Sequence, residues 1–192
     1  GQSISYAARL NGIRAVIVVP HGNNPEKNAA MRSLGAELIE HGTEFQEALE
    51  FSREMAAQND LHAVLSFHPW LVRGVATYGL EMFRSVADLD YIFVSIGLGS
   101  GFCGIVAARE ALGLKTKIIG VVSEHAPAYA LSFEKGFLIT QSSTTTVAEG
   151  VACKTPNPEA LEQVMRHAHE IIRVTDEEAV DAVREIIQTT HN

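Results

Sequence analysis

The sequence has little of what marks secreted, membrane-spanning or nucleic-acid-binding proteins. Its only two cysteines, Cys103 and Cys153, lie far apart without metal-ligand spacing, which gives no support for a disulfide framework and favours a reducing cytoplasm. No apolar run approaches the ~20 residues that cross a bilayer. Lysine and arginine form no run and the formal net charge is -8, so nucleic acid and anionic membranes are poor partners.

An initiator methionine and a first strand are also missing. The chain opens at Gly1-Gln2-Ser3 within a helical pattern, and we expect it to be an interior piece of something longer. The absence of a targeting signal therefore excludes little. What is present, 192 residues with 46% hydrophobic and 20% charged residues, is typical of an ordinary globular protein with a small-molecule partner.

Short β-branched runs alternate with helical patterns along the chain. The strands we predict cover residues 15–19, 37–40, 63–67, 91–96, 117–122, 137–140 and 171–174. The helices cover residues 2–10, 26–34, 45–56, 75–86, 102–112, 127–133 and 161–168, and a last helix follows the capping box of Thr175 and Glu178. Repeated βα units predict α/β architecture, with mostly parallel sheets covered by helices and a ligand crevice at the carboxyl ends of the strands.

The most informative segment is a glycine-dense turn after the apolar run 91–96. It reads Gly97-Leu98-Gly99-Ser100-Gly101 and leads into a helical pattern. Glycines let the backbone approach an anion closely, and the free amides and positive dipole end of a helix attract negative charge. The segment therefore predicts a ligand that carries phosphate.

A nicotinamide cofactor is the competing interpretation of the same turn. Gly99, Gly101 and Gly104 match the G-x-G-x-x-G dinucleotide fingerprint, and Glu124 ends the next strand about where a ribose-binding acid would lie, ~20 residues on. Against this interpretation, Gly97 adds a glycine that the fingerprint does not require, and several βα units precede the turn. The alternative remains open at this point.

Several ordered motifs together resemble a known family. They are Gly1-Gln2-Ser3, which is similar to the end of an S-x-G-N-H-G-Q signature, residues 15–20 with Lys27 and residues 34–37, Phe67-His68-Pro69 with Gly74, the glycine turn, Glu124, and residues 146–152. Over essentially the whole chain, the sequence resembles the fold type II pyridoxal 5'-phosphate enzymes, specifically the threonine/serine dehydratases and serine racemases.

This resemblance implies a fold, a cofactor and a reaction. The fold is the tryptophan synthase β-like one, with residues 1–68 in a small mobile domain and residues 69–192 in a large domain that binds the cofactor phosphate. The cofactor is pyridoxal 5'-phosphate, and its implied contacts are Gly97, Leu98, Gly99, Ser100, Gly101 and, at the ring, Gly150. The implied reaction is β-elimination from L-threonine or L-serine to a 2-oxo acid and ammonia, in a cytoplasmic homo-oligomer.

Among the departures from the family pattern, two concern the catalytic residue and the metal site. The Schiff-base lysine of the family lies before Gly1, so no catalytic residue is assigned in this chain, which we expect to be inactive alone. Ala130 stands where relatives with a divalent-cation site have an acid, so no metal site is assigned. Serine racemase or another amino-acid lyase, a nicotinamide-dependent oxidoreductase domain and a noncatalytic fragment remain as alternatives.

Overall fold

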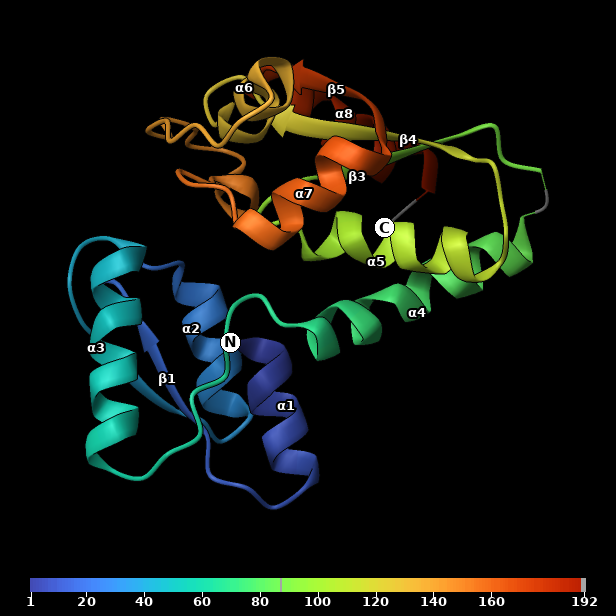
Figure 1. Cartoon of the computed structure of the whole chain (residues 1–192). Helices are drawn as coiled ribbons and strands as arrows, with labels where there is room; N and C mark the ends of the chain where they lie inside the picture. The colour runs from blue at the N-terminus through green and yellow to red at the C-terminus, as the bar shows by residue number, and fades with distance from the viewer. Residues whose placement is uncertain (87, 191–192) are drawn as a thin grey trace. The chain divides into compact units, whose positions relative to one another are not determined.

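The computed structural model describes residues 1–86 and 88–190. The chain divides into two compact units, Gly1–Val64 and Leu65–Asn192, and each is described by itself. Parallel strands flanked by helices form both units, which confirms the α/β class (Figure 1). The division lies at Val64, close to the boundary at residue 68 that the sequence suggests.

The first unit contains α1 (Gln2–Leu10), β1 (Val16–Val19), α2 (Pro25–Ser33), β2 (Glu37–Glu40) and α3 (Phe45–Gln58). β1 and β2 pair in parallel from Val16 opposite Glu37 to Val19 opposite Glu40. α2 begins where the sequence predicts a helix, because Asn24 caps it by accepting from the backbone N–H groups of Glu26 and Lys27 at 2.9 and 3.1 Å.

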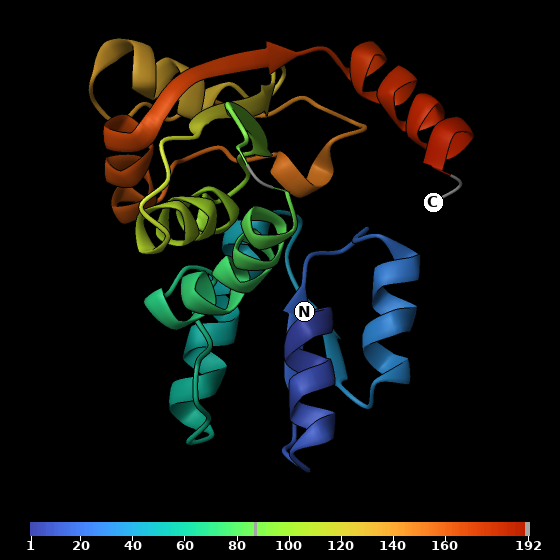
Figure 2. The ribbon, with the colours of Figure 1, turned by 90° about the vertical axis from the view of Figure 1, so that its right-hand side faces the viewer.

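The second unit contains a three-stranded parallel sheet in the order β3 (Tyr91–Ser95), β4 (Lys117–Ser123) and β5 (Ala168–Val174). Its helices are α4 (Pro69–Ser85), α5 (Ser100–Ala111), α6 (Ala128–Lys135), α7 (Pro158–His167) and α8 (Asp176–Thr190), with a short 3₁₀ turn η1 (Glu149–Val151). β5 follows α7 directly and α8 follows β5, as the red end of the ribbon shows (Figure 2). Because the strands are parallel, their carboxyl ends lie along one edge of the sheet.

The core of the second unit is centred on α5. Phe102 and Ile105 are fully buried, and they pack in one cluster with Ile118 of β4 and Val164 of α7. α5 also packs closely on α4, since a Cβ added at Gly104 would lie 3.0 Å from the Ala76 backbone nitrogen. The start of α5, where the glycine turn lies, is therefore fixed by core packing.

Two predicted strands do not form. Residues 63–67 have no strand geometry, and Val64 and Leu65 are 47% and 44% exposed. Residues 137–140 are also irregular, because the Ile139 N–H donates to the Ser132 Oγ at 2.9 Å in place of a ladder bond. Hydrophobic runs of this length form strands only where a neighbouring strand accepts their backbone hydrogen bonds.

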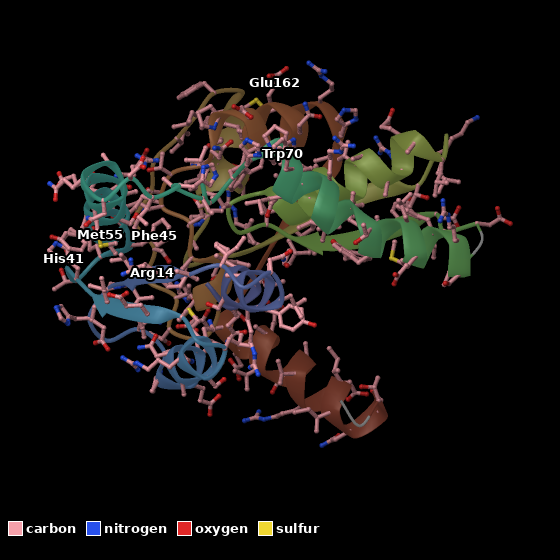
Figure 3. All side chains as sticks on the ribbon, turned by 90° about the horizontal axis from the view of Figure 1, so that it is seen from below. Arg14, His41, Phe45, Met55, Trp70 and Glu162 are labelled. Carbon is pink, nitrogen blue, oxygen red and sulfur yellow. The ribbon has the colours of Figure 1, made fainter. Side chains whose placement is uncertain are left out.

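α4 begins at Pro69, earlier than the residue 75 that the sequence suggests. Proline is favourable at the first helical position, and the His68 Nδ1 accepts from the Trp70 N–H at 3.2 Å, which caps the helix. Trp70, the only tryptophan of the sequence, is 76% exposed (Figure 3). Among the described residues, no helix is long and apolar enough to cross a membrane.

Candidate functional site

The glycine turn lies at the carboxyl end of β3 and leads into the first turn of α5. The Cys103 N–H donates to the Gly99 carbonyl at 3.0 Å, so the amides of Ser100, Gly101 and Phe102 belong to the first turn, which an α-helix leaves without intrahelical acceptors. No acidic side chain lies in that turn. The position combines free backbone donors with the positive end of a helix dipole, as an anion site requires.

Two of the glycines are required by the geometry. Gly99 has a φ of +103°, and a Cβ there would lie 2.5 Å from the Ala160 Cβ and 2.9 Å from the Tyr129 Oη. A Cβ on Gly97 would lie 2.8 Å from the Gly150 carbonyl oxygen. Gly101 differs, because a Cβ there meets nothing within 4 Å. Gly99 thus sets the turn, and Gly97 lets the backbone at Gly150 come close.

Gly150, the predicted contact of the cofactor ring, therefore lies next to Gly97 of the glycine turn. Gly150 is the central residue of η1, which is closed by the Val151 N–H donating to the Ala148 carbonyl at 3.0 Å. The Gln141 N–H donates to the Lys154 carbonyl at 2.9 Å and closes the base of the loop that contains η1. A Cβ at Gly150 would meet no atom within 4 Å, so this backbone has an open side.

Tyr129 of α6 binds the backbone of the glycine turn through its hydroxyl group. Its side chain is 1% exposed, and its hydroxyl donates to the Leu98 carbonyl at 2.7 Å and accepts from the Asn157 N–H at 3.2 Å. Burial raises the pKa of Tyr129, so the hydroxyl stays protonated and keeps its donor role. The Asn157 side chain in turn caps α7 by accepting from the Ala160 N–H at 3.0 Å. The sequence contains no signal for this role of Tyr129.

Replacing Tyr129 by phenylalanine should lower the free energy of unfolding by about 1–3 kcal/mol, because the Leu98 carbonyl and the Asn157 N–H would lose a buried partner. Urea unfolding followed by circular dichroism measures this change. The matched control is Tyr78→Phe, at a side chain that is 46% exposed, where we expect a change within about 0.5 kcal/mol. Equal effects of the two substitutions would contradict the role given to Tyr129.

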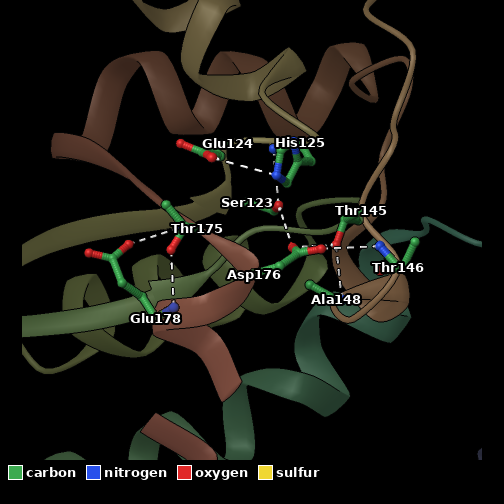
Figure 4. A network of polar contacts seen from close by, with 9 residues as sticks. All are labelled: Ser123, Glu124, His125, Thr145, Thr146, Ala148, Thr175, Asp176 and Glu178. Carbon is green, nitrogen blue, oxygen red and sulfur yellow. Dashed lines mark hydrogen bonds and ion pairs between the residues drawn. The ribbon is translucent and has the colours of Figure 1, made fainter. Parts of the chain in front are cut away.

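Asp176, the first residue of α8, lies at the centre of a second polar network at the same edge of the sheet (Figure 4). Its carboxylate accepts from the Thr145 hydroxyl at 2.7 Å, from the Thr146 N–H at 3.2 Å and from the Ser123 hydroxyl at 3.4 Å. The pKa of Asp176 is lowered, and the largest cause is the hydrogen bond from the Thr145 hydroxyl. The Thr146 N–H and the nearby His125 lower it further. The carboxylate is therefore ionised at neutral pH.

Gly104 and Glu124, on which the nicotinamide interpretation depends, have other contacts in this fold. Gly104 provides the close approach of α5 to α4, since a Cβ there would lie 3.0 Å from a Val75 methyl carbon, whereas the fingerprint uses its third glycine between helix and strand. Glu124 follows β4, and its carboxylate lies 3.5 Å from the His125 Nε2. Across residues 1–86 and 88–190, no three His, Cys, Asp or Glu side chains cluster in a way that could hold a metal ion.

A groove of about 740 Å³ lies elsewhere in the second unit, along α4, α5 and α7, and none of the residues of the glycine turn line it. Cys103 does line it, but burial raises the pKa of this thiol to about 11. A thiol that stays protonated at neutral pH is a poor nucleophile. The groove therefore offers no covalent catalysis through Cys103.

Comparison with known proteins identifies the family. The family described as "pyridoxal-phosphate dependent enzyme" matches residues 1–192, the whole chain. The chain belongs to this family. The resemblance read from the sequence motifs is thus confirmed. The chain is similar to the L-threonine ammonia-lyase of Thermotoga maritima, at 31% identity over 183 residues, and to the catabolic L-threonine dehydratase of Staphylococcus aureus, at 31% identity over 191 residues.

Two solved structures have the same fold as this chain. Threonine deaminase isoform 2 of Solanum lycopersicum has a TM-score of 0.91 at 25% identity, over 100% of this chain and 56% of that one. Maize serine racemase also has a TM-score of 0.91, at 24% identity, which supports the fold alone. The match to the Thermotoga protein includes 95% of this chain and 46% of that protein. The match to the Staphylococcus protein includes 97% of this chain and 54% of that protein. The chain thus spans about half the length of these relatives.

Proposed function

We propose that this chain forms the phosphate-binding part of a pyridoxal phosphate-dependent lyase that eliminates water from L-threonine or L-serine. The observation that carries the proposal is the glycine turn at the start of α5, with the Gly150 carbonyl close to Gly97 and the Cβ position of Gly150 open. The names of the 31% identical relatives, an L-threonine ammonia-lyase and a catabolic L-threonine dehydratase, support the reaction class and the amino-acid substrate.

The residues present fit the cofactor at both ends. The amides of Ser100 and Gly101 and the Ser100 hydroxyl would bind the phosphate, while Gly97, Leu98 and Gly99 shape the turn. The Gly150 backbone would border the ring, where the absence of a side chain leaves room. Pyridoxal phosphate, when bound, supplies an electron sink for charge at the amino-acid Cα. The part of these residues is to hold and orient that group.

The activity is tested in the complete gene product. We expect it to release ammonia with 2-oxobutyrate from L-threonine, or with pyruvate from L-serine, measured by coupled dehydrogenase assays. Because Ala130 has a methyl group where the metal-site acid would lie, added magnesium or calcium should change the rate by less than about twofold. Racemised serine without any oxo acid would move the assignment to the racemases, and reduction of a nicotinamide would overturn it.

Residues 1–192 alone should carry no cofactor-binding lysine. Incubation with pyridoxal phosphate followed by borohydride should modify no single lysine stoichiometrically, because none matches the lysine that the family resemblance places before Gly1. Peptide mapping by mass spectrometry reads this out. A stoichiometric adduct at one residue would contradict the prediction; the lysines to examine are Lys27, Lys115, Lys117, Lys135 and Lys154.

A noncatalytic role remains the second candidate, since no assigned catalytic residue lies in the chain. A gene product that contains no lysine at the family position would favour it. The division into a small mobile unit and a larger cofactor-binding unit, the homo-oligomer and the cytoplasmic location stay predictions. Light scattering, cell fractionation and cofactor titration of the separate units test them.

A further inference from the structure

The carboxylate of Asp176 joins three segments that are distant in the sequence. Thr145 and Thr146 lie 31 and 30 residues before it, in the loop that leads to η1, and Ser123 lies 53 residues before it, at the end of β4. Ser123 is 2% exposed, so one of the donors is anchored in the core. Asp176 therefore ties the loop to the carboxyl edge of the sheet from the start of α8 (Figure 4).

α8 does not need Asp176 as a cap. The Thr175 hydroxyl accepts from the Glu178 N–H at 3.0 Å, and the Glu178 carboxylate accepts from the Thr175 N–H at 2.8 Å, which completes a capping box. The Asp176 oxygens are thus directed to the loop while the helix start is already satisfied. A contact made in addition to the cap points to a role outside the helix.

The hydrogen bonds continue from Asp176 to the Gly150 backbone. The Thr145 hydroxyl donates its proton to Asp176 and accepts from the Ala148 N–H at 3.0 Å. The Ala148 carbonyl then accepts from the Val151 N–H at 3.0 Å, which closes the turn around Gly150. One hydroxyl acts as donor and acceptor at once, so both bonds depend on its orientation. That orientation is set by the ionised carboxylate.

The same loop has a second attachment at the sheet edge. The Thr144 N–H donates to the His125 carbonyl at 2.8 Å, and the His125 N–H donates to the Ser123 Oγ at 3.1 Å. The backbone bond keeps the loop near β4 when Asp176 is altered. Loss of the carboxylate should therefore displace residues 145–150 locally without detaching the loop.

We infer that Asp176 is a positioning residue, which holds the Gly150 backbone at the distance from the glycine turn that the cofactor ring requires. The inference rests on the proposed function, because Gly150 is the ring contact only in that function. Asp176 acts through Thr145 and the η1 turn and touches no reacting group. This positioning role explains why the Asp176 carboxylate, at the start of α8, accepts a hydrogen bond from a loop 30 residues earlier in the sequence.

The first measurement needs no cofactor. In the full chain, Asp176→Asn should speed the amide hydrogen exchange of Ala148 and Val151 at least about tenfold, because the weaker acceptor frees the Thr145 hydroxyl to rotate. The control is Asp181→Asn on the same helix, whose carboxylate makes an exposed pair with Arg184 at 2.8 Å and should leave this exchange unchanged. Unchanged exchange in Asp176→Asn would overturn the inference.

The second measurement uses the complete, cofactor-loaded gene product. Asp176→Asn and Thr145→Val should each lower kcat/KM by about 10- to 100-fold and alter the visible absorbance of the bound cofactor, and the double variant should lose no more than the worse single one. Thr145→Ser keeps the hydroxyl and should restore most of the rate. Faster exchange with unchanged absorbance and kcat/KM would show a structural role only and overturn the inference.

Failure of the proposed function is distinguishable. An unaltered gene product that binds the cofactor but eliminates nothing from threonine or serine would overturn the lyase. In that case, the cofactor absorbance of Asp176→Asn against Asp181→Asn still decides on Asp176. An altered absorbance supports the positioning role, and an unaltered one rejects it.

Discussion

Gly99→Ala should destabilise this chain by about 2–5 kcal/mol and abolish phosphate binding at the start of α5. The estimate combines the cost of an L-residue at a φ of +103° with the overpacking of a methyl group against Ala160 and Tyr129. Urea unfolding gives the free energy. A phosphate titration followed by NMR gives the binding, through the amide shifts of Ser100 and Gly101.

The control for this prediction lies two residues along the same turn. Gly101→Ala adds the same methyl group where no atom lies within 4 Å, so its free energy of unfolding should stay within about 0.5 kcal/mol of the unaltered chain. If both alanine variants were equally stable and both bound phosphate, the geometry assigned to Gly99 would be wrong. If both were destabilised equally, the loss would not arise from the positive φ.

Phe102→Ala should cost about 3–5 kcal/mol, the largest loss expected for a single truncation here. Phe102 is fully buried in the first turn of α5, and its removal leaves a cavity that the surrounding core cannot fill completely. The first-turn amides would lose their fixed direction as well. We therefore expect weaker phosphate shifts at Ser100 in addition to a lower urea midpoint.

Phe137→Ala is the matched truncation outside the core. Phe137 is 61% exposed, so the same loss of atoms should change the free energy of unfolding by less than about 1 kcal/mol and leave the phosphate shifts intact. A comparable loss at Phe137 would mean that the exposed segment after α6 packs against something that stabilises the folded chain, and it would contradict the core assignment of Phe102.

Local signals in the sequence were sufficient for most helices and strands and for the glycine turn. The Thr175 and Glu178 capping box forms as predicted, because its partners are three residues apart and need no tertiary context. The same holds for β2, whose bounds are those predicted, and for the turn after β3. The predictions of strands at residues 63–67 and 137–140 were wrong, because strand formation depends on a neighbouring strand that a local sequence pattern does not specify.

The contacts that hold the candidate site were beyond a single sequence. Tyr129 reaches the Leu98 carbonyl across 31 positions, and Asp176 reaches Thr145 across the same number, so no periodicity or spacing links the partners. Both residues also have ordinary local explanations, as a core aromatic and a helix-start acid. Only the folded chain shows that each has its polar atoms directed at a backbone segment of the site.

In the parallel sheet of the second unit, the segments of the candidate site follow the strands at the carboxyl edge. The two edges of this sheet should therefore differ in how well they tolerate an insertion. The glycine turn follows β3, Ser123 ends β4 and Asp176 follows β5, all at the carboxyl edge. The connection at residues 112–116 lies at the opposite edge, where Leu114 is 38% exposed. A reporter peptide or fluorescent tag inserted there would leave the site intact, so this edge is the place for probes in crystallography or single-molecule work.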